Sequence, residues 1–232
     1  MRTDLVLGGM TPLSTIDFPG RLAAVFYTQG CPLRCGYCHN PELWESRGPA
    51  AIPWDEALAW LHRRRGLLDG VVFSGGEPTA QEALGAALAQ VRDLGFATAL
   101  HTAGVYPKRL TEILPLLDWV GLDIKAPFDR YADLTGVPGS GAKARQSLAA
   151  VLTCGVEYEL RTTVHHRLLA PEDLMAMAQH LRSYGVRRWV LQEFRTQGCA
   201  DAELANSPSR LDPALVAHLR ELVPDITVRA AA

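Results

Sequence analysis

No stretch of this sequence approaches the roughly 18 consecutive apolar residues of a membrane-spanning helix. Its first residues also lack the apolar core and cleavage site of a signal peptide. We therefore expect a cytoplasmic protein with no membrane partner. Long runs of one charge are missing too, since the net charge is −2 and the one basic run, His62–Arg65, falls at the end of an expected helix. We accordingly expect no nucleic-acid partner.

The chain contains no linker rich in Ser, Pro or Gly, and no internal repeat beyond an alternation of strand and helix patterns. Hydrophobic residues make up 48% and charged residues 21%, which is ordinary for a globular protein with a real core. We therefore expect one domain over residues 1–232, with a core at about 20–196 and a C-terminal extension at about 197–232.

Short apolar, β-branched runs alternate with longer amphipathic runs along the core. The expected strands are Leu22–Thr28, Gly70–Phe73, Ala97–Thr102, Trp119–Ile124, Glu157–Val164 and Arg188–Phe194. The expected helices are Trp54–Arg65, Gln81–Leu94, Lys108–Leu117, Ala142–Thr153 and Pro171–Tyr184. Thr79 and Glu82 form a capping-box pattern before the second of these helices. After Phe194 we expect a helix at Asp212–Leu222 and a short apolar run at Ile226–Val228, and we expect a loop at Pro127–Gly141.

Six alternating strand and helix segments favour an α/β fold with right-handed βαβ units and a parallel sheet. The sheet could be open and doubly wound, or it could curl into a partial barrel. In both arrangements ligands bind at the carboxyl ends of the strands. The residues that do chemistry are therefore expected directly after each strand.

Cysteine is scarce, yet three of the five cysteines, Cys31, Cys35 and Cys38, lie within eight positions after the first strand. In a reducing compartment such a group binds metal or acts in redox chemistry more often than it forms disulfides. Three thiolates can hold three corners of an iron–sulfur cube and leave one iron open. Two alternatives are a zinc site completed by His39 and three unligated structural cysteines.

Two further cysteines stand alone in the sequence. Cys154, at a helix end, is expected to be a small buried hydrophobic residue. Cys199 lies in a loop beside a glycine, and the sequence assigns it no role.

The cysteine segment, Cys-Pro-Leu-Arg-Cys-Gly-Tyr-Cys, resembles the Cys-x-x-x-Cys-x-aromatic-Cys signature of the radical S-adenosylmethionine superfamily, with Tyr37 at the aromatic position. The resemblance implies one 4Fe-4S cluster held by Cys31, Cys35 and Cys38, with S-adenosylmethionine as the second cofactor. It also implies a partial (β/α)6 TIM-like barrel, which fits the six βα units.

The second expected strand is followed by Gly75, Gly76 and Glu77. Two glycines permit a close approach of a ligand to the backbone, and Glu77 could supply an anion for a ligand ammonium group. Alone, Gly-Gly-Glu-Pro could equally be a tight turn. The position resembles the superfamily's Gly-Gly-Glu motif, which implies contact with the amino group of the methionyl moiety.

The fourth expected strand places Asp123 and Lys125 on one face. A plain ion pair is the simple interpretation, but the spacing resembles the Asp-x-Lys motif of glycyl-radical-enzyme activating enzymes. Arg161 on the fifth strand matches an arginine that those enzymes carry there, so all three residues are expected to bind the cofactor. His165, which follows the same strand, is a further candidate, although a polar cap at a barrel mouth would be equally ordinary.

The third expected strand ends in His101-Thr102-Ala103-Gly104, where many relatives carry Asp-Thr-Asn-Gly. Thr102 still fits a cofactor site, but the loss of the acid at His101 weakens the inference of a bound cation. Upstream, the segment Ser14–Arg21 resembles Asp-Gly-Pro-Gly-x-Arg, with Phe18 replacing a glycine. Together with Cys-His-Asn-Pro at 38–41, this resembles the activating proteins of anaerobic ribonucleoside-triphosphate reductase.

The resemblance implies an enzyme that reductively cleaves S-adenosylmethionine and generates a glycyl radical on a partner enzyme, with electrons from a flavodoxin- or ferredoxin-type donor. A first alternative is radical chemistry on a small molecule, although this short chain offers few extra substrate-binding elements. A second is a non-catalytic iron–sulfur electron carrier, which would not need the Gly75–Glu77 motif.

Overall fold

The structure, a computed structural model, describes residues 5–48, 52–199, 201–207 and 209–230. Residues 1–4, which were considered above for a signal sequence, lie outside this part. A nine-stranded sheet runs in the order β3-β1-β2-β4-β5-β6-β7-β8-β9. Its strands are β1 (Val6–Ser14), β2 (Ala23–Thr28), β3 (Ile52–Pro53), β4 (Gly70–Gly75), β5 (Ala97–Thr102), β6 (Trp119–Asp123), β7 (Glu157–Val164), β8 (Arg188–Glu193) and β9 (Asp225–Arg229).

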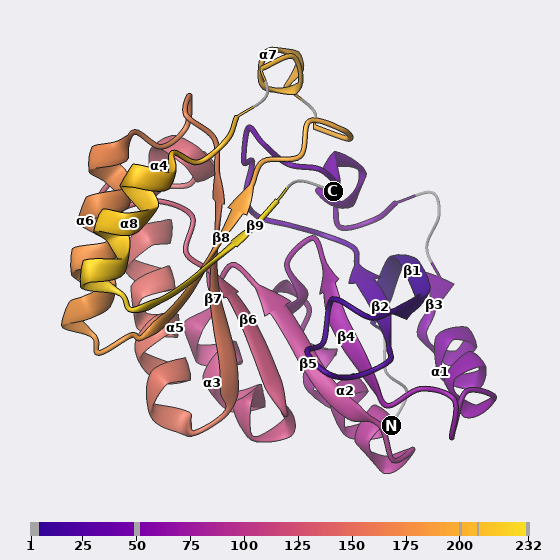
Figure 1. The fold of residues 1–232 in the computed structure, drawn as a ribbon. Coiled ribbons are helices and arrows are strands. Elements are labelled where there is room, and N and C mark those ends of the chain that lie inside the picture. The colour runs from indigo at the N-terminus through magenta and orange to yellow at the C-terminus, as the bar shows by residue number, and fades with distance from the viewer. Residues whose placement is uncertain (1–4, 49–51, 200, 208, 231–232) are drawn as a thin grey trace.

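The six predicted strands are confirmed as β2 and β4–β8, and neighbouring members of this set pair in parallel. The sheet curves without closing, and helices cover its outer face (Figure 1). The fold is thus an open, TIM-like α/β barrel, as predicted.

The helices are α1 (Trp54–His62), α2 (Leu84–Asp93), α3 (Pro107–Ile113), α4 (Tyr131–Thr135), α5 (Ser140–Cys154), α6 (Pro171–Ser183), α7 (Ala202–Ala205) and α8 (Pro213–Leu222), with 3-10 turns η1 (Pro41–Leu43), η2 (Pro78–Ala80) and η3 (Leu114–Leu116). Among the described helices none is long and apolar enough to cross a bilayer.

The sheet extends beyond the six predicted strands at both edges. On one side β1 pairs antiparallel with both β2 and β3. The sequence did not predict β1, because Gly8, Gly9 and Pro12 interrupt its strand pattern. A side chain at Gly8 would overlap Leu43 and Gln29, so the glycine that weakens the pattern is required for packing. On the other side β9, which includes the predicted apolar run, pairs in parallel with β8.

The interior of the barrel is apolar on the side of β2 and β4–β6. There Phe18, from the segment between β1 and β2, packs with Val25, Val72, Ala99 and Trp119 in a buried cluster. A larger apolar core lies between the sheet and its outer helices. The β7–β9 side of the interior carries charged residues instead, including a two-bond ion pair between Glu159 and Arg229.

The predicted capping box is wrong. Helix α2 begins at Leu84, three residues later than predicted, and its N-cap residue Ala83 makes no side-chain cap. Thr79 lies in η2, and its hydroxyl and amide both donate to the buried carboxylate of Glu77. Glu82 pairs with Arg109 instead. The Thr79 hydroxyl therefore bonds to the buried Glu77 carboxylate and does not cap the helix.

Two further predictions in this half of the chain are corrected. Cys154 is exposed rather than buried, because the buried stripe of α5 ends at Val151 and the last turn faces outward. The region Pro127–Gly141, expected as loop, contains α4 and the first two residues of α5. Helix α4 is capped by Gly136 in the left-handed conformation.

Gly141, the second residue of α5, provides a test of how tightly this helix packs against the segment that contains Phe128. A methyl group there would overlap the carbonyl oxygen of Phe128, a backbone atom that cannot rotate away. We expect Gly141→Ala to lower the free energy of unfolding by about 2–3 kcal/mol. The matched control is Gly85→Ala, at the second residue of α2, where the methyl would contact Ile113 at an ordinary 3.5 Å. That change should leave stability equal or raise it by up to about 1 kcal/mol. Equal effects in urea unfolding would contradict this packing argument.

Candidate active site

The three clustered cysteines lie in the irregular segment that directly follows β2. The amide of Cys31 donates to the carbonyl of Trp44 at 3.0 Å, and the amide of Cys38 donates to the carbonyl of Cys35 at 3.0 Å. All three thiols are free and line one cavity of about 220 Å³. Because Gly75, from the end of β4, lines the same cavity, the cysteines lie at the carboxyl edge of the sheet, as predicted.

Burial makes bare thiolates unfavourable at this site. It raises the pKa of Cys31 to about 12, and it also raises the pKa of Cys35. Such thiols become anionic ligands when a metal supplies the compensating positive charge. Three cysteine sulfurs around one cavity are a donor set that suits an iron–sulfur cluster with one iron left for another ligand.

His39 does not complete a zinc site with these cysteines. Its Nε2 donates to the carbonyl of Arg195 at 2.6 Å, and its ring lies 5.3 Å from the ring of Phe194. Within the described ranges, no three Cys, His, Asp or Glu side chains converge on a single-ion site. The zinc alternative therefore has no geometric support.

Arg34, between the first two cysteines, holds the cysteine segment together. Its guanidinium donates to the carbonyls of Cys31 at 2.7 Å and Leu33 at 3.0 Å, and lies 5.3 Å from the ring centre of Trp44. Its amide donates to the carbonyl of Thr135, the last residue of α4. The sequence analysis missed this role, since a guanidinium bonded to local carbonyls leaves no pattern in the sequence.

The two glycines after β4 pack directly against the start of the cysteine segment. Gly75 has a φ of +110°, and a side chain there would overlap the backbone of Thr28. A side chain at Gly76 would overlap the carbonyl of Gly30 and approach that of Leu43 to 3.0 Å. Both glycines line the cavity. Their main chain is therefore open to a ligand that lies against the cysteines.

The carboxylate of Glu77, in contrast, does not line the cavity. It is fully buried, with Oε1 accepting from Thr102 Oγ1 at 2.6 Å and from the Thr79 amide at 3.1 Å, and Oε2 accepting from the Ala103 amide at 2.8 Å. Burial raises the pKa of Glu77, although these hydrogen bonds favour the carboxylate. The contact expected between Glu77 and a ligand ammonium group stays a prediction. In the structure Glu77 joins the loops at the ends of β4 and β5, and Thr102 lines the cavity.

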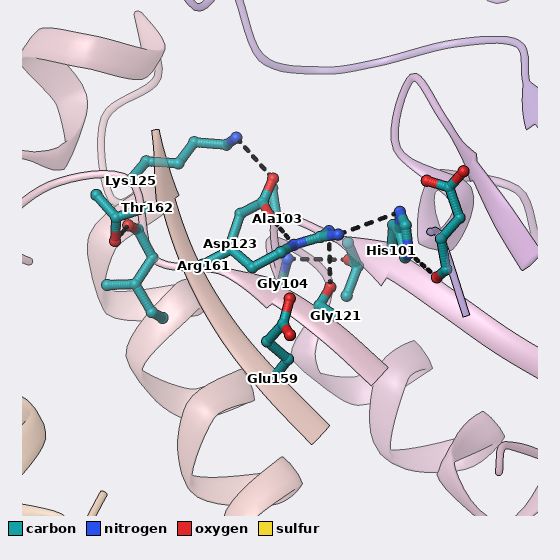
Figure 2. A network of polar contacts seen from close by, with 12 residues as sticks. His101, Ala103, Gly104, Gly121, Asp123, Lys125, Glu159, Arg161 and Thr162 are labelled. Atoms are coloured by element: carbon teal, nitrogen blue, oxygen red, sulfur yellow. Dashed lines mark hydrogen bonds and ion pairs between the residues drawn. The ribbon is translucent and has the colours of Figure 1, made fainter. Parts of the chain in front are cut away.

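Asp123, Lys125 and Arg161 come together at the cavity as the sequence predicted (Figure 2). Asp123 Oδ2 lies 3.2 Å from Lys125 Nζ, and its Oδ1 lies 3.1 Å from Arg161 Nε. Lys125 Nζ also donates to Tyr37 Oη at 3.2 Å. The side chains of Lys125 and Arg161 are only 11% and 10% exposed, so these ion pairs are poorly screened by solvent.

The two cations keep Asp123 ionised. Burial alone would raise the pKa of Asp123, but Lys125 and Arg161 outweigh it and lower that pKa below its ordinary value. Burial likewise opposes the charge on Lys125, yet the nearby Asp123 carboxylate raises the pKa of Lys125 above its usual range. Burial raises the pKa of Tyr37, so its hydroxyl stays protonated. The cavity thus presents one carboxylate and two fixed cations.

His101, noted in the sequence only as a departure, is part of the same network. One ring nitrogen lies 2.9 Å from the carbonyl of Asp17, and the other lies 3.3 Å from Arg161 Nη1. The ring packs edge-on against Trp119 at 5.5 Å. Burial, together with the charge of Arg161, lowers the pKa of His101 to about 3. The ring is therefore neutral.

Tyr131, in α4, is a site residue that the sequence analysis missed. Its hydroxyl donates to the carbonyl of Asp123 at 3.0 Å and accepts from the amide of Lys125 at 2.9 Å. It thereby fixes the backbone just after β6. It lies in the region expected as loop, where the sequence carried no signal for a buried tyrosine.

His165 does not line the cavity. Its Nε2 donates to the carbonyl of Ser207 at 2.6 Å, its Nδ1 accepts from the amide of Arg167 at 3.1 Å, and its ring meets Phe194 edge-on at 5.0 Å. The histidine is fully buried and fastens the C-terminal extension to the end of β7. Of the predicted cofactor-binding residues, His165 and the Glu77 side chain are the two that lie outside the cavity lining.

Several solved structures have a similar fold. One is SuiB of Streptococcus suis bound to S-adenosylmethionine, with a TM-score of 0.65 and 16% identity over 90% of this chain; the chain spans about half of that structure's length (49%). Another is QueE of Escherichia coli, with a TM-score of 0.61 and 17% identity over 97% of this chain and 93% of that one. At these identities the likeness shows the fold alone.

Sequence comparisons are more specific. The family model of the radical SAM superfamily matches residues 25–181. The pyruvate formate-lyase-activating enzyme of Clostridium pasteurianum is 34% identical over 207 residues, which is 86% of each chain. A protein of Methanocaldococcus jannaschii that is named as a glycyl-radical enzyme activating enzyme is 27% identical over 212 residues, covering 88% of this chain and 85% of that one. The chain therefore belongs to the radical SAM superfamily and, within it, to the glycyl-radical enzyme activating enzymes.

Proposed function

We propose that this enzyme activates anaerobic ribonucleoside-triphosphate reductase, with electrons from a flavodoxin- or ferredoxin-type donor. As a family member it uses a 4Fe-4S cluster and S-adenosylmethionine and generates glycyl radicals. The observation that carries the assignment of this cavity as the radical site is its lining. Three free cysteines, the Gly75–Gly76 turn and the Asp123, Lys125 and Arg161 cluster all line this one cavity.

Cys31, Cys35 and Cys38 are the proposed ligands of three irons of the cluster. The cluster, when bound, supplies the electron that cleaves the sulfonium of S-adenosylmethionine. The chain's task is to keep the ligand thiolates in one place and to exclude water. Trp44 and Arg34 anchor the first ligand through its main chain, and the burial of Cys35 favours a site protected from solvent.

The remaining cavity residues are proposed to hold S-adenosylmethionine. The main chain of Gly75 and Gly76 can lie against its methionyl part, since neither residue has a side chain in the way. Lys125 and Arg161 offer donors for its carboxylate, and Thr102 completes the wall beside them. Glu77 acts indirectly, by fixing the loop that Thr102 and Ala103 begin.

The choice of partner rests on local motifs. The segments Ser14–Arg21 and Cys38–Pro41 resemble the activating proteins of anaerobic ribonucleotide reductase. The curated relative with 34% identity is named for pyruvate formate-lyase, which makes that enzyme the competing partner. A small-molecule substrate is the third possibility. A non-catalytic electron carrier is disfavoured, since it would need no cavity beside its cysteines.

The radical assignment predicts cofactor cleavage that depends on the clustered cysteines. After anaerobic reconstitution and reduction with dithionite, the wild type should convert S-adenosylmethionine to 5′-deoxyadenosine. Cys35→Ala should retain less iron and reduce that product to background. The matched control is Cys154→Ala, which removes an exposed cysteine far along the chain and should leave both quantities unchanged. Equal product from Cys35→Ala and the wild type would contradict the ligand assignment.

The partner proposal predicts a selective activation. The reduced enzyme with S-adenosylmethionine should produce a glycyl radical signal in electron paramagnetic resonance when mixed with anaerobic ribonucleotide reductase, and none with pyruvate formate-lyase. A signal with pyruvate formate-lyase alone would show that the partner is wrong while the chemistry stands. 5′-Deoxyadenosine without a signal on either protein would direct the search to small molecules.

A further inference from the structure

The hydrogen bonds of His101 determine which of its ring nitrogens carries the proton. The carbonyl of Asp17 can only accept, and the guanidinium of Arg161 can only donate. The ring must therefore donate from Nε2 to Asp17 at 2.9 Å and accept at Nδ1 from Arg161 Nη1, 3.3 Å away. A doubly protonated ring would also carry a proton on Nδ1, and this proton would point at the Arg161 guanidinium, which can only donate. The geometry thus selects one neutral tautomer.

Arg161 is held on three sides at this point. Its Nε donates to Asp123 Oδ1 at 3.1 Å, its Nη1 donates to His101, and its Nη2 lies 3.5 Å from the carbonyl of Gly121. A side chain at position 121 would approach the Arg161 guanidinium carbon to 2.8 Å. The guanidinium fits there because residue 121 is glycine. Figure 2 shows His101, Gly121 and Asp123 around it.

This arrangement leaves part of the guanidinium free for a ligand. An arginine has five N–H bonds, and the contacts within the described part of the chain use three of them. Because Arg161 lines the cavity, the other two are available to an acceptor there. Without His101, rotation of the guanidinium plane would be restrained only by Asp123 and by the longer contact to Gly121.

This inference rests on the proposed binding of S-adenosylmethionine in the cavity. We propose that His101 is a positioning residue, which through its Nδ1 lone pair orients the Arg161 guanidinium so that the free N–H groups meet an anionic acceptor of the ligand, the methionyl carboxylate. The contact with Asp17 serves to present Nδ1 rather than Nε2 to Arg161. His101 itself touches no reacting atom.

Two variants separate the two hydrogen bonds of the ring. In His101→Asn the amide oxygen can take the place of Nδ1, so the acceptor for Arg161 is kept and the bond to Asp17 is lost. In His101→Gln the amide nitrogen can take the place of Nε2, so the bond to Asp17 is kept and the acceptor for Arg161 is lost. The pair therefore distinguishes positioning of Arg161 from simple support of the Asp17 segment.

The measurement is the dissociation constant of S-adenosylmethionine for each reconstituted protein under anaerobic conditions, with the melting temperature recorded beside it. We expect His101→Gln to weaken binding about tenfold, as the loss of a hydrogen bond to a charged group should, while His101→Asn stays close to the wild type. His218→Gln, at an exposed position of α8, is the neutral control.

Three results would overturn the proposal. Unchanged affinity in His101→Gln would show that Arg161 needs no acceptor there. If both variants lost the same affinity for S-adenosylmethionine and the same amount of melting temperature, the role of His101 would be structural only. A wild type that holds its cluster but binds no S-adenosylmethionine would remove the proposed function itself, and this inference with it.

Discussion

The buried main-chain and side-chain bonds of Glu77 connect the loops that follow three adjacent strands. Its amide donates to the carbonyl of Gly30, at the start of the cysteine segment, and its carboxylate accepts from Thr102, the last residue of β5, and from Ala103. A buried carboxylate without partners would be costly, so these loops are fixed relative to one another once the acid is inside. The cysteines and the cavity-lining residues Thr102 and Ala103 are thereby placed together.

A second carboxylate, that of Asp123, organises the charged part of the cavity lining. Its side chain is 33% exposed, but the two cations beside it are largely buried, so removal of Asp123 would leave both of them poorly compensated. The polar network continues through His101 to the main chain of Asp17, in the segment that packs Phe18 into the barrel. The segment between β1 and β2 is thus connected to the cavity by hydrogen bonds as well as by apolar packing.

The sequence predicted the parallel strands and the position of the chemistry well. Apolar, β-branched runs such as Gly70–Phe73 are local signals of a strand. Because ligands bind at the carboxyl ends of parallel strands, these signals also indicate where the site lies. The direction in which a polar side chain points is not determined by its neighbours in sequence. Glu77 and His165 both follow strands, yet one turns into the protein to meet Thr102 and the other to meet Ser207, and those partners are distant in sequence. Sequence patterns around Glu77 and His165 therefore could not indicate these hydrogen-bond partners. β1 was missed for a similar reason, since Gly8 is required by contacts with Leu43 and Gln29 that its neighbours in sequence do not reveal.

An anaerobic crystal structure of the reconstituted enzyme with S-adenosylmethionine would test the account most directly. The account predicts that the sulfurs of Cys31, Cys35 and Cys38 bind three irons and that the methionyl end lies between the cluster and Arg161. The Glu77 carboxylate should still be bonded to Thr102. A fourth protein ligand on the remaining iron, such as His39 or Cys199, or a methionyl end bound outside this cavity, would contradict it.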